Sequence, residues 1–377
     1  MAPLTLAYVT PEVLLWARES AGYSVEDAAG KINLSWSQLE AVENGHDLLT
    51  LRQAEMLAKF YGRPLATLFL SEPPEEEPQD TQFRRLPGAP APPWPAAMQL
   101  LVRRIRERQD AATELYEALE EPPPWIARAK EFIARDRKSL PRVAREVLGV
   151  GQEEQANWSE QYAPLRAWTD AVEGQGILVM QDGSMPVEDM RGFASIDSAV
   201  PVVVANTKDD PRARAFTVIH EFGHLVLAAN GVSAERQTER WCNKFAGEVL
   251  MPSDWLAEAF HESAASSLLG RVEQVARVFS VTPLAAAVRL RATGSVPQQE
   301  GDDLINEIRL RGRETVRAPG GGDYYLNQIA GLGPRFIRLV FSALDSQAVT
   351  YPVASALLAG VKVNHFERLR DQLGRRG

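Results

Sequence analysis

The sequence predicts an α+β protein that is mostly α-helical and has one small sheet in its central part. Three observations indicate this class. Apolar residues recur at three- and four-residue spacing in many segments, which is typical of amphipathic helices. Two short segments rich in β-branched residues, 176–181 and 200–206, have the composition of strands. A proline-rich stretch, 71–95, separates the N-terminal helices from the rest.

Length and composition exclude several classes of protein. At 377 residues the chain exceeds the size at which one core keeps growing, so two or more domains are expected. No apolar run reaches the length of a membrane span, and the first residues lack the pattern of a secretory signal. Cys242 is the single cysteine, so no internal disulfide can form and a reducing compartment is favoured. We therefore expect a cytoplasmic protein that does not contact a membrane.

Residues 1–70 contain four short amphipathic segments: 11–22, 24–32, 35–43 and 50–60. Ser24 and Ser35 stand where helix N-caps are expected, and Gly22 and Gly45 where helices stop.

This pattern resembles the Xre/Cro-type helix-turn-helix domain over about residues 8–70. The resemblance implies an N-terminal helix-turn-helix bundle, 1–70, in which 35–43 is the recognition helix. That helix presents Trp36, Ser37, Gln38 and Ala41 near its start.

The charge of this N-terminal bundle opposes strong DNA binding. It holds five basic and eight acidic side chains, a net charge of −3, within a chain whose net charge is −9. Neutralisation of phosphates supplies most non-specific DNA affinity. Two uses therefore stay open: weak or dimer-dependent binding of operator DNA through residues 24–45, or docking of a protein.

The region after the bundle begins with an expected linker. Eight of the chain's 25 prolines fall in 71–95, which predicts a semi-stiff, extended linker over 71–97. A charged helix over 98–121 follows. Its arginines at 103, 104, 106 and 108 interleave with acidic residues, so a solvated face is expected.

The segment His220-Glu221-Phe222-Gly223-His224 lies within an apolar helical pattern. Residues four apart share one face of a helix, so both imidazoles could bind one metal ion at about 2.0–2.1 Å. Glu221 lies one step round the helix, close enough to take a proton from water without being a ligand. Two histidines buried in such a helix without a partner would be costly. The pattern therefore indicates a catalytic zinc site.

A catalytic zinc usually has three protein ligands. A second helical pattern begins near Glu235 and ends at Pro252, and a short loop at 230–231 lets it fold back on the first. Glu235 and Glu239 share a face of this helix, so periodicity alone does not choose between them. Glu248 lies further along and points another way.

Segments 212–225 and 239–252 resemble the ImmA/IrrE family of zinc metallopeptidases. That family pairs H-E-x-x-H with a later E-x-x-x-N-x-F-A…L-M-P, as this sequence does. The resemblance implies that His220, His224 and Glu239 bind Zn²⁺ and that Glu221 is the general base. Cys242 stands where the family often has alanine. Asn243 either supports the Glu239 carboxylate or is an ordinary helix residue.

Residues 98–295 are expected to form a zincin-like metallopeptidase domain, and the helical patterns after it predict a C-terminal helical region, 296–377. In such a fold an edge strand binds an extended peptide. Segment 200–206 is either such an edge strand or simply buried core, and both hold if the strand packs on one face and is open along its edge. Segment 272–290 has a helix–turn–helix pattern, which we expect to pack on the peptidase core. Four residues are able to stabilise an oxyanion, but the sequence assigns none of them: His261, Tyr324, Tyr325 and His365.

The leading hypothesis is a zinc-dependent endopeptidase. By resemblance alone, its substrate is a partner transcriptional repressor or antitoxin in a stress, phage-related or toxin–antitoxin context. The alternative is a DNA-binding regulator or toxin–antitoxin component whose metallopeptidase-like domain is a sensor or scaffold without turnover. Glu221 favours the first, because a purely structural zinc needs no general base.

Overall fold

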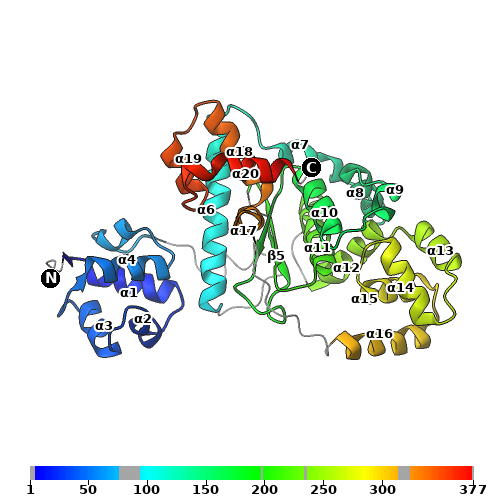
Figure 1. The fold of residues 1–377 in the computed structure, drawn as a ribbon, viewed down its shortest axis with the longest axis horizontal. Coiled ribbons are helices and arrows are strands. Elements are labelled where there is room, and N and C mark those ends of the chain that lie inside the picture. The colour runs from blue at the N-terminus through cyan, green and yellow to red at the C-terminus, as the bar shows by residue number, and fades with distance from the viewer. Residues whose placement is uncertain (1–4, 76–93, 197, 233–235, 313–322, 376–377) are drawn as a thin grey trace. The chain divides into compact units, whose positions relative to one another are not determined.

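A computed structural model describes residues 5–75, 94–196, 198–232, 236–312 and 323–375 (Figure 1). The chain forms two compact units, one of residues 1–83 with 90–108 and the other of 84–89 with 109–377. Helix α6 (Ala96–Ala118) therefore gives its first part to one unit and its remainder to the other. The C-terminal helices belong to the same unit as the central sheet.

The four helices predicted in the first unit are present as α1 (Pro11–Ser20), α2 (Val25–Lys31), α3 (Trp36–Glu43) and α4 (Leu51–Phe60). The predicted N-caps are confirmed, because the Ser24 and Ser35 side chains accept backbone N–H groups at the starts of α2 and α3. Gly22 and Gly45 follow α1 and α3 with φ of +74° and +76°, as expected of helix stops.

Three short elements of this unit carry no sequence signal. They are the antiparallel ribbon of β1 (Leu6–Ala7) and β2 (Leu49–Thr50), and the 3₁₀ helix η1 (Leu65–Phe69). Elements of two to five residues are too short to show a period, so only their tertiary pairing defines them.

The first part of α6 packs against the helix-turn-helix bundle. Gly62 has φ of +64°, and a Cβ there would lie 2.8 Å from Leu100 Cδ2. Arg103 donates hydrogen bonds to the carbonyl oxygens of Tyr61 (2.7 Å) and Ser20 (3.2 Å), at the C-terminal ends of α4 and α1. The expectation of a solvated arginine face is therefore wrong for Arg103, whose charge stabilises two helix ends.

The central sheet of the second unit has the order β3 (Leu178–Asp182), β5 (Val202–Asn206), β4 (Gly192–Ser195). β3 is parallel and β4 antiparallel to β5, so both predicted strands are present. The prediction that segment 200–206 has an open edge is wrong. It forms the central strand, because the unpredicted strand β4 pairs along its other side.

The two edges of this sheet differ. At the β3 edge, helix α17 (Tyr324–Leu332) ends at Gly333, where a Cβ would lie 2.9 Å from the Val179 oxygen. At the β4 edge, Asn206 N donates a hydrogen bond to Arg191 O. In an antiparallel pair only alternate residues bond to the partner strand, so the N–H and C=O groups of Gly192 and Ala194 point away from β5. Within the described ranges these outward groups have no hydrogen-bond partner. The free edge of the sheet is therefore β4.

Helices α10 (Ala163–Glu173) and α11 (Pro211–Ala229) pack against this sheet (Figure 1). The remaining elements are α7 (Pro124–Arg128), η2 (Ala129–Phe132), α8 (Leu140–Leu148), α9 (Gln152–Ala156), α12 (Arg236–Leu250), α13 (Ser253–His261), α14 (Leu268–Val278), α15 (Pro283–Thr293), α16 (Gln298–Gly312), α18 (Pro334–Asp345), α19 (Tyr351–Leu357), η3 (Val363–His365) and α20 (Phe366–Gly374). Val272, Val275 and Leu290 of α14 and α15 are buried in the same core as Phe222 of α11, so the predicted packing is confirmed. Every helix in the described part of the chain is too short or too polar to cross a bilayer.

Candidate metal centre

Helix α11 carries the H-E-x-x-H segment. The Asp210 side chain accepts the Arg212 N–H at its start, and Pro211 occupies the first turn, where its missing N–H costs nothing. His220 and His224 lie one turn apart with ring centroids 5.2 Å from each other. Both rings are almost fully buried.

A close approach between α11 and α12 brings the third side chain to these histidines. A Cβ on Gly223 would lie 2.9 Å from Phe245 Cδ1 and 3.4 Å from Cys242 Sγ, so glycine at this position lets the helices touch. Cys242 is fully buried at this contact, where only a small side chain fits. Glu239 lies one turn before it, and its carboxylate reaches both imidazoles.

The three candidate ligands converge. Glu239 Oε2 is 3.2 Å from His220 Nε2, and Glu239 Oε1 is 3.2 Å from His224 Nε2. All three candidate ligand atoms lie within 4.8 Å of one another, and this is the one such group found in the described ranges. The Glu239 side chain is 47% exposed, so the candidate metal centre is open to solvent on the side of Glu239.

The two other glutamates considered from the sequence differ in outcome. Glu248 accepts hydrogen bonds from Ser253 and pairs with Arg289, which gives it a role in joining α12, α13 and α15. Glu235 lies outside the described residues.

Two buried polar atoms at this centre lack partners among the described residues. His224 Nε2 makes no hydrogen bond there although Glu239 is near, and Glu221 Oε2 has no partner. Buried polar atoms are normally satisfied, and leaving one unpaired is costly. A cation between the two imidazole nitrogens and the Glu239 carboxylate would remove the first of these costs. Two nitrogens and one oxygen form a donor set that zinc commonly takes.

The buried position of the centre shifts the acidity of its groups. Burial, opposed by the two histidines and aided by the Glu239 carboxylate, raises the pKa of Glu221 to about 7. Burial alone would lower the pKa of His220, but hydrogen bonds with Glu239 and Asn243 and the charge of Glu221 raise it overall. The nearby imidazoles of His220 and then of His224 hold the pKa of Glu239 far below its usual range.

Strand β4 adjoins Glu221, which the sequence did not indicate. A Cβ on Gly192 would lie 2.4 Å from Thr217 Cγ2, 2.5 Å from Val204 O and 3.5 Å from Glu221 Cγ. Glycine is therefore required for the strand to pass this close to α11. In the sequence, this strand could have been predicted only from a glycine before the apolar pair Phe193-Ala194, which is a weak signal.

The four possible oxyanion-stabilising residues do not join the cluster. The Tyr325 hydroxyl and His365 Nδ1 hydrogen-bond each other at 2.5 Å and so join α17 to η3. Tyr324 packs edge-on against Tyr325, and His261 is exposed at the end of α13.

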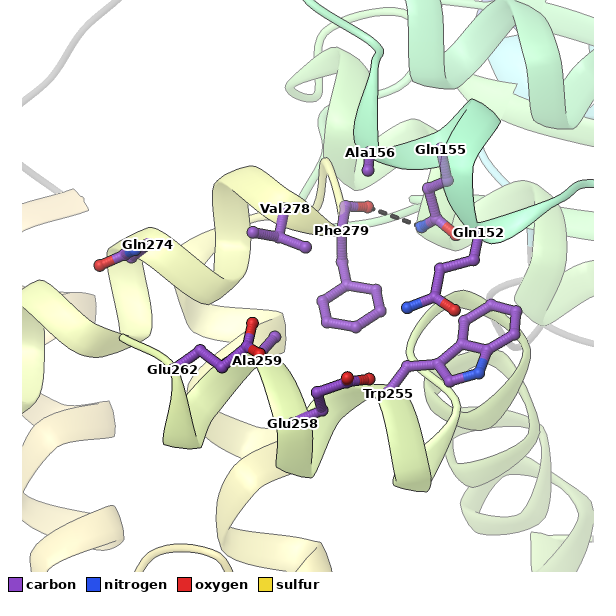
Figure 2. A pocket seen from close by; sticks show the side chains of 10 residues that line it. All are labelled: Gln152, Gln155, Ala156, Trp255, Glu258, Ala259, Glu262, Gln274, Val278 and Phe279. Atoms are coloured by element: carbon purple, nitrogen blue, oxygen red, sulfur yellow. Dashed lines mark hydrogen bonds between the residues drawn. The ribbon is translucent and has the colours of Figure 1, made fainter. Parts of the chain in front are cut away.

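A separate hollow of about 280 Å³ lies between α9, α13 and α14 (Figure 2). Its walls include Trp255 and Phe279 but none of the candidate ligands. Gln155 at its wall donates to the carbonyl oxygens of Phe279 (2.8 Å) and Leu250 (3.0 Å), and accepts from Arg145, which also donates to Val249 O (2.7 Å). These buried polar groups anchor the C-terminal end of α12.

In the first unit, α3 exposes Trp36, Ser37 and Gln38. Three of the five basic side chains of residues 1–70 interact with other side chains of the bundle. Arg18 forms two hydrogen bonds with buried Glu43 (2.8 and 3.0 Å), Arg63 lies 4.2 Å from the Trp16 ring centroid and Lys31 5.2 Å from that of Phe60. The capacity for phosphate contacts is therefore small.

The helix pair, the converging His-His-Glu cluster and the adjoining strand define the class of H-E-x-x-H metallopeptidase-like domains. Residues 172–291 match the family described as the IrrE N-terminal-like domain (Peptidase_M78), and residues 14–68 match the family described as helix-turn-helix. The chain therefore contains an IrrE N-terminal-like domain and an Xre-type helix-turn-helix domain, as the sequence predicted. No curated protein and no solved structure was found to match it.

Proposed function

We propose that the chain is a zinc-dependent endopeptidase in which His220, His224 and Glu239 bind the metal and Glu221 is the general base. The observation that carries this proposal is the convergence of three ligand atoms within 4.8 Å, beside a buried glutamate that is not among them. A bound zinc ion would supply Lewis-acid polarisation of a carbonyl group and of water.

The chain's own residues support the remaining steps. Within the part of the chain that the structure describes, no group hydrogen-bonds to Glu221 Oε2, so this oxygen can take a proton from water and pass it to the leaving amine. The outward main-chain groups of Gly192 and Ala194 can pair with an extended peptide. Because Gly192 adjoins Glu221, a peptide in this position would cross the metal centre. The scissile bond would then lie between Glu221 and the three ligands.

For the substrate we propose a partner transcriptional repressor or antitoxin, because the same chain carries a helix-turn-helix domain. The helix-turn-helix match suggests DNA binding, and we propose operator DNA as the target of residues 24–45. The second candidate function is a regulator whose metallopeptidase-like domain does not turn over. The fusion to a helix-turn-helix domain favours it.

The variant Glu221→Gln separates the two functions. We expect it to retain zinc and the unfolding transition of the wild type, because Gln has the size of Glu and no ligand is lost. Cleavage of a peptide library derived from cell extract, followed by mass spectrometry, should fall at least about a hundredfold, as expected for loss of general-base catalysis. Equal cleavage of the library by the wild type and by Glu221→Gln would refute the peptidase proposal. So would a zinc-loaded wild type that cleaves neither the library nor the regulator encoded nearest to this protein.

A further inference from the structure

The N-terminal unit has a strand edge that is open and apolar. β1 pairs with β2 on one side only, in the register Leu6 with Thr50 and Ala7 with Leu49. Leu51 N donates to Thr5 O, so the ladder alternation turns the N–H and C=O groups of Leu6 and Tyr8 away from β2. In the described part of the chain these outward groups have no partner.

The side chains along this edge are also exposed. Leu6 is 46% and Tyr8 73% exposed, and Leu48, which the same register places opposite Tyr8, is 41% exposed. The three lie on one face of the ribbon, because alternate residues of a strand share a face and directly opposite residues do too. Ala7, between Leu6 and Tyr8, is buried in the bundle core.

Protein edges of this kind are normally protected by a charged side chain or a proline. Residues 5–10 are Thr-Leu-Ala-Tyr-Val-Thr and contain neither. The absence of charge matters here, because residues 1–70 carry a net −3 and two such surfaces otherwise repel each other. The edge of β1 is thus a place where two acidic bundles can meet without like charges in the contact.

We propose that β1 pairs with β1 of a second copy of this chain, antiparallel and centred on Ala7. In this register Leu6 lies opposite Tyr8 of the second copy, and the outward groups of both residues form two reciprocal hydrogen-bonded pairs. The leucine and tyrosine side chains pack across the strands on the exposed face. The contact is self-complementary, as a two-fold dimer requires, and it joins the two ribbons into one four-stranded sheet. The sheet forms whether or not the metal centre is catalytic.

The size of the contact sets its strength. A short strand pair with two apolar side chains per copy is smaller than a standard stable interface, so the dimer dissociates on dilution. Sedimentation velocity of the full chain, over roughly 1 to 100 µM, should show a monomer–dimer equilibrium in this range. Tyr8→Lys should weaken it at least tenfold, because the charge would be buried opposite Leu6. The matched control is Trp36→Lys, an exposed aromatic residue of the same unit on α3, which should leave it unchanged.

A cross-linking experiment tests the register. Hydrogen-bonded antiparallel pairs have Cα atoms about 5.5 Å apart, within the range that a disulfide spans. Full-length Leu6→Cys and Tyr8→Cys proteins, mixed and treated with oxidised glutathione, should form a covalent dimer that neither forms alone. A wild type that stays monomeric, a dimer that Tyr8→Lys leaves intact, or equal cross-linking in the unmixed variants would each overturn the proposal.

Discussion

The contact at Gly223 is expected to control both the stability of the second unit and its affinity for zinc. In Gly223→Ala, the new Cβ would lie 2.9 Å from Phe245 Cδ1 and 3.4 Å from Cys242 Sγ. Phe245 is fully buried and cannot give way freely, so α12 must shift by several tenths of an ångström. Overpacking of this kind costs about 1–3 kcal/mol. Alanine recovers about 0.8–1 kcal/mol through its higher helix propensity, which leaves a net loss of up to about 2 kcal/mol.

The same shift moves Glu239 relative to His220 and His224, so zinc affinity should fall by about tenfold or more, as when a ligand's support is altered. Denaturant unfolding and competition with a chromophoric chelator measure the two effects. Gly30→Ala is the matched control, because Gly30 lies in α2 with no atom within 4 Å of the added Cβ. It should gain about 0.5–1 kcal/mol and leave zinc affinity unchanged. Our account of the helix contact is incorrect if Gly223→Ala matches this control in both measurements.

Two further predictions concern buried charges. Burial raises the pKa of Glu173 to about 8 despite Arg338 at 3.5 Å, so the folded protein holds the carboxyl neutral where the unfolded chain ionises it. Relative to Glu173→Gln, the free energy of unfolding of the wild type should fall by a few kcal/mol as pH rises from about 4.5 to about 8, and then level off. Parallel curves of unfolding free energy against pH for the two proteins would contradict this. In the first unit, Arg18→Met leaves Glu43 buried and unpaired and should cost about 3–5 kcal/mol in denaturant unfolding. Adding Glu43→Leu to Arg18→Met should restore part of the lost stability. A double variant that is no more stable than Arg18→Met would argue against the Arg18–Glu43 ion pair.

Short-range sequence patterns were sufficient to predict the helices and the H-E-x-x-H motif. The N-caps at Ser24 and Ser35 and the proline after α12 are short-range signals, and their elements appear as predicted. The i, i+4 spacing of His220 and His224 is likewise a property of one helix. For Glu239, periodicity left Glu235 as an equal choice, and the family resemblance favoured the residue that the structure places beside both histidines.

The unpredicted features depend on contacts between distant segments. β4 has the sequence Gly-Phe-Ala-Ser, without β-branched residues, and is a strand only because β5 lies beside it. Its presence places β5 in the centre of the sheet and transfers the free edge to Gly192. The sequence could not distinguish Arg103 from the arginines at 104, 106 and 108, because the carbonyl groups that Arg103 binds belong to residues at the ends of α1 and α4.

The anchoring of α12 at one end has a consequence for the third ligand. Arg145 and Gln155 fasten its last carbonyl groups to the core, whereas Glu239 lies in its first turn. The N-terminal turn is where the helix macrodipole favours a negative charge. Helix α12 is therefore held at its C-terminal end, and its N-terminal end carries a carboxylate whose negative charge the helix dipole favours. A metal ion bound by Glu239 would act at the end of α12 opposite the anchored carbonyl groups.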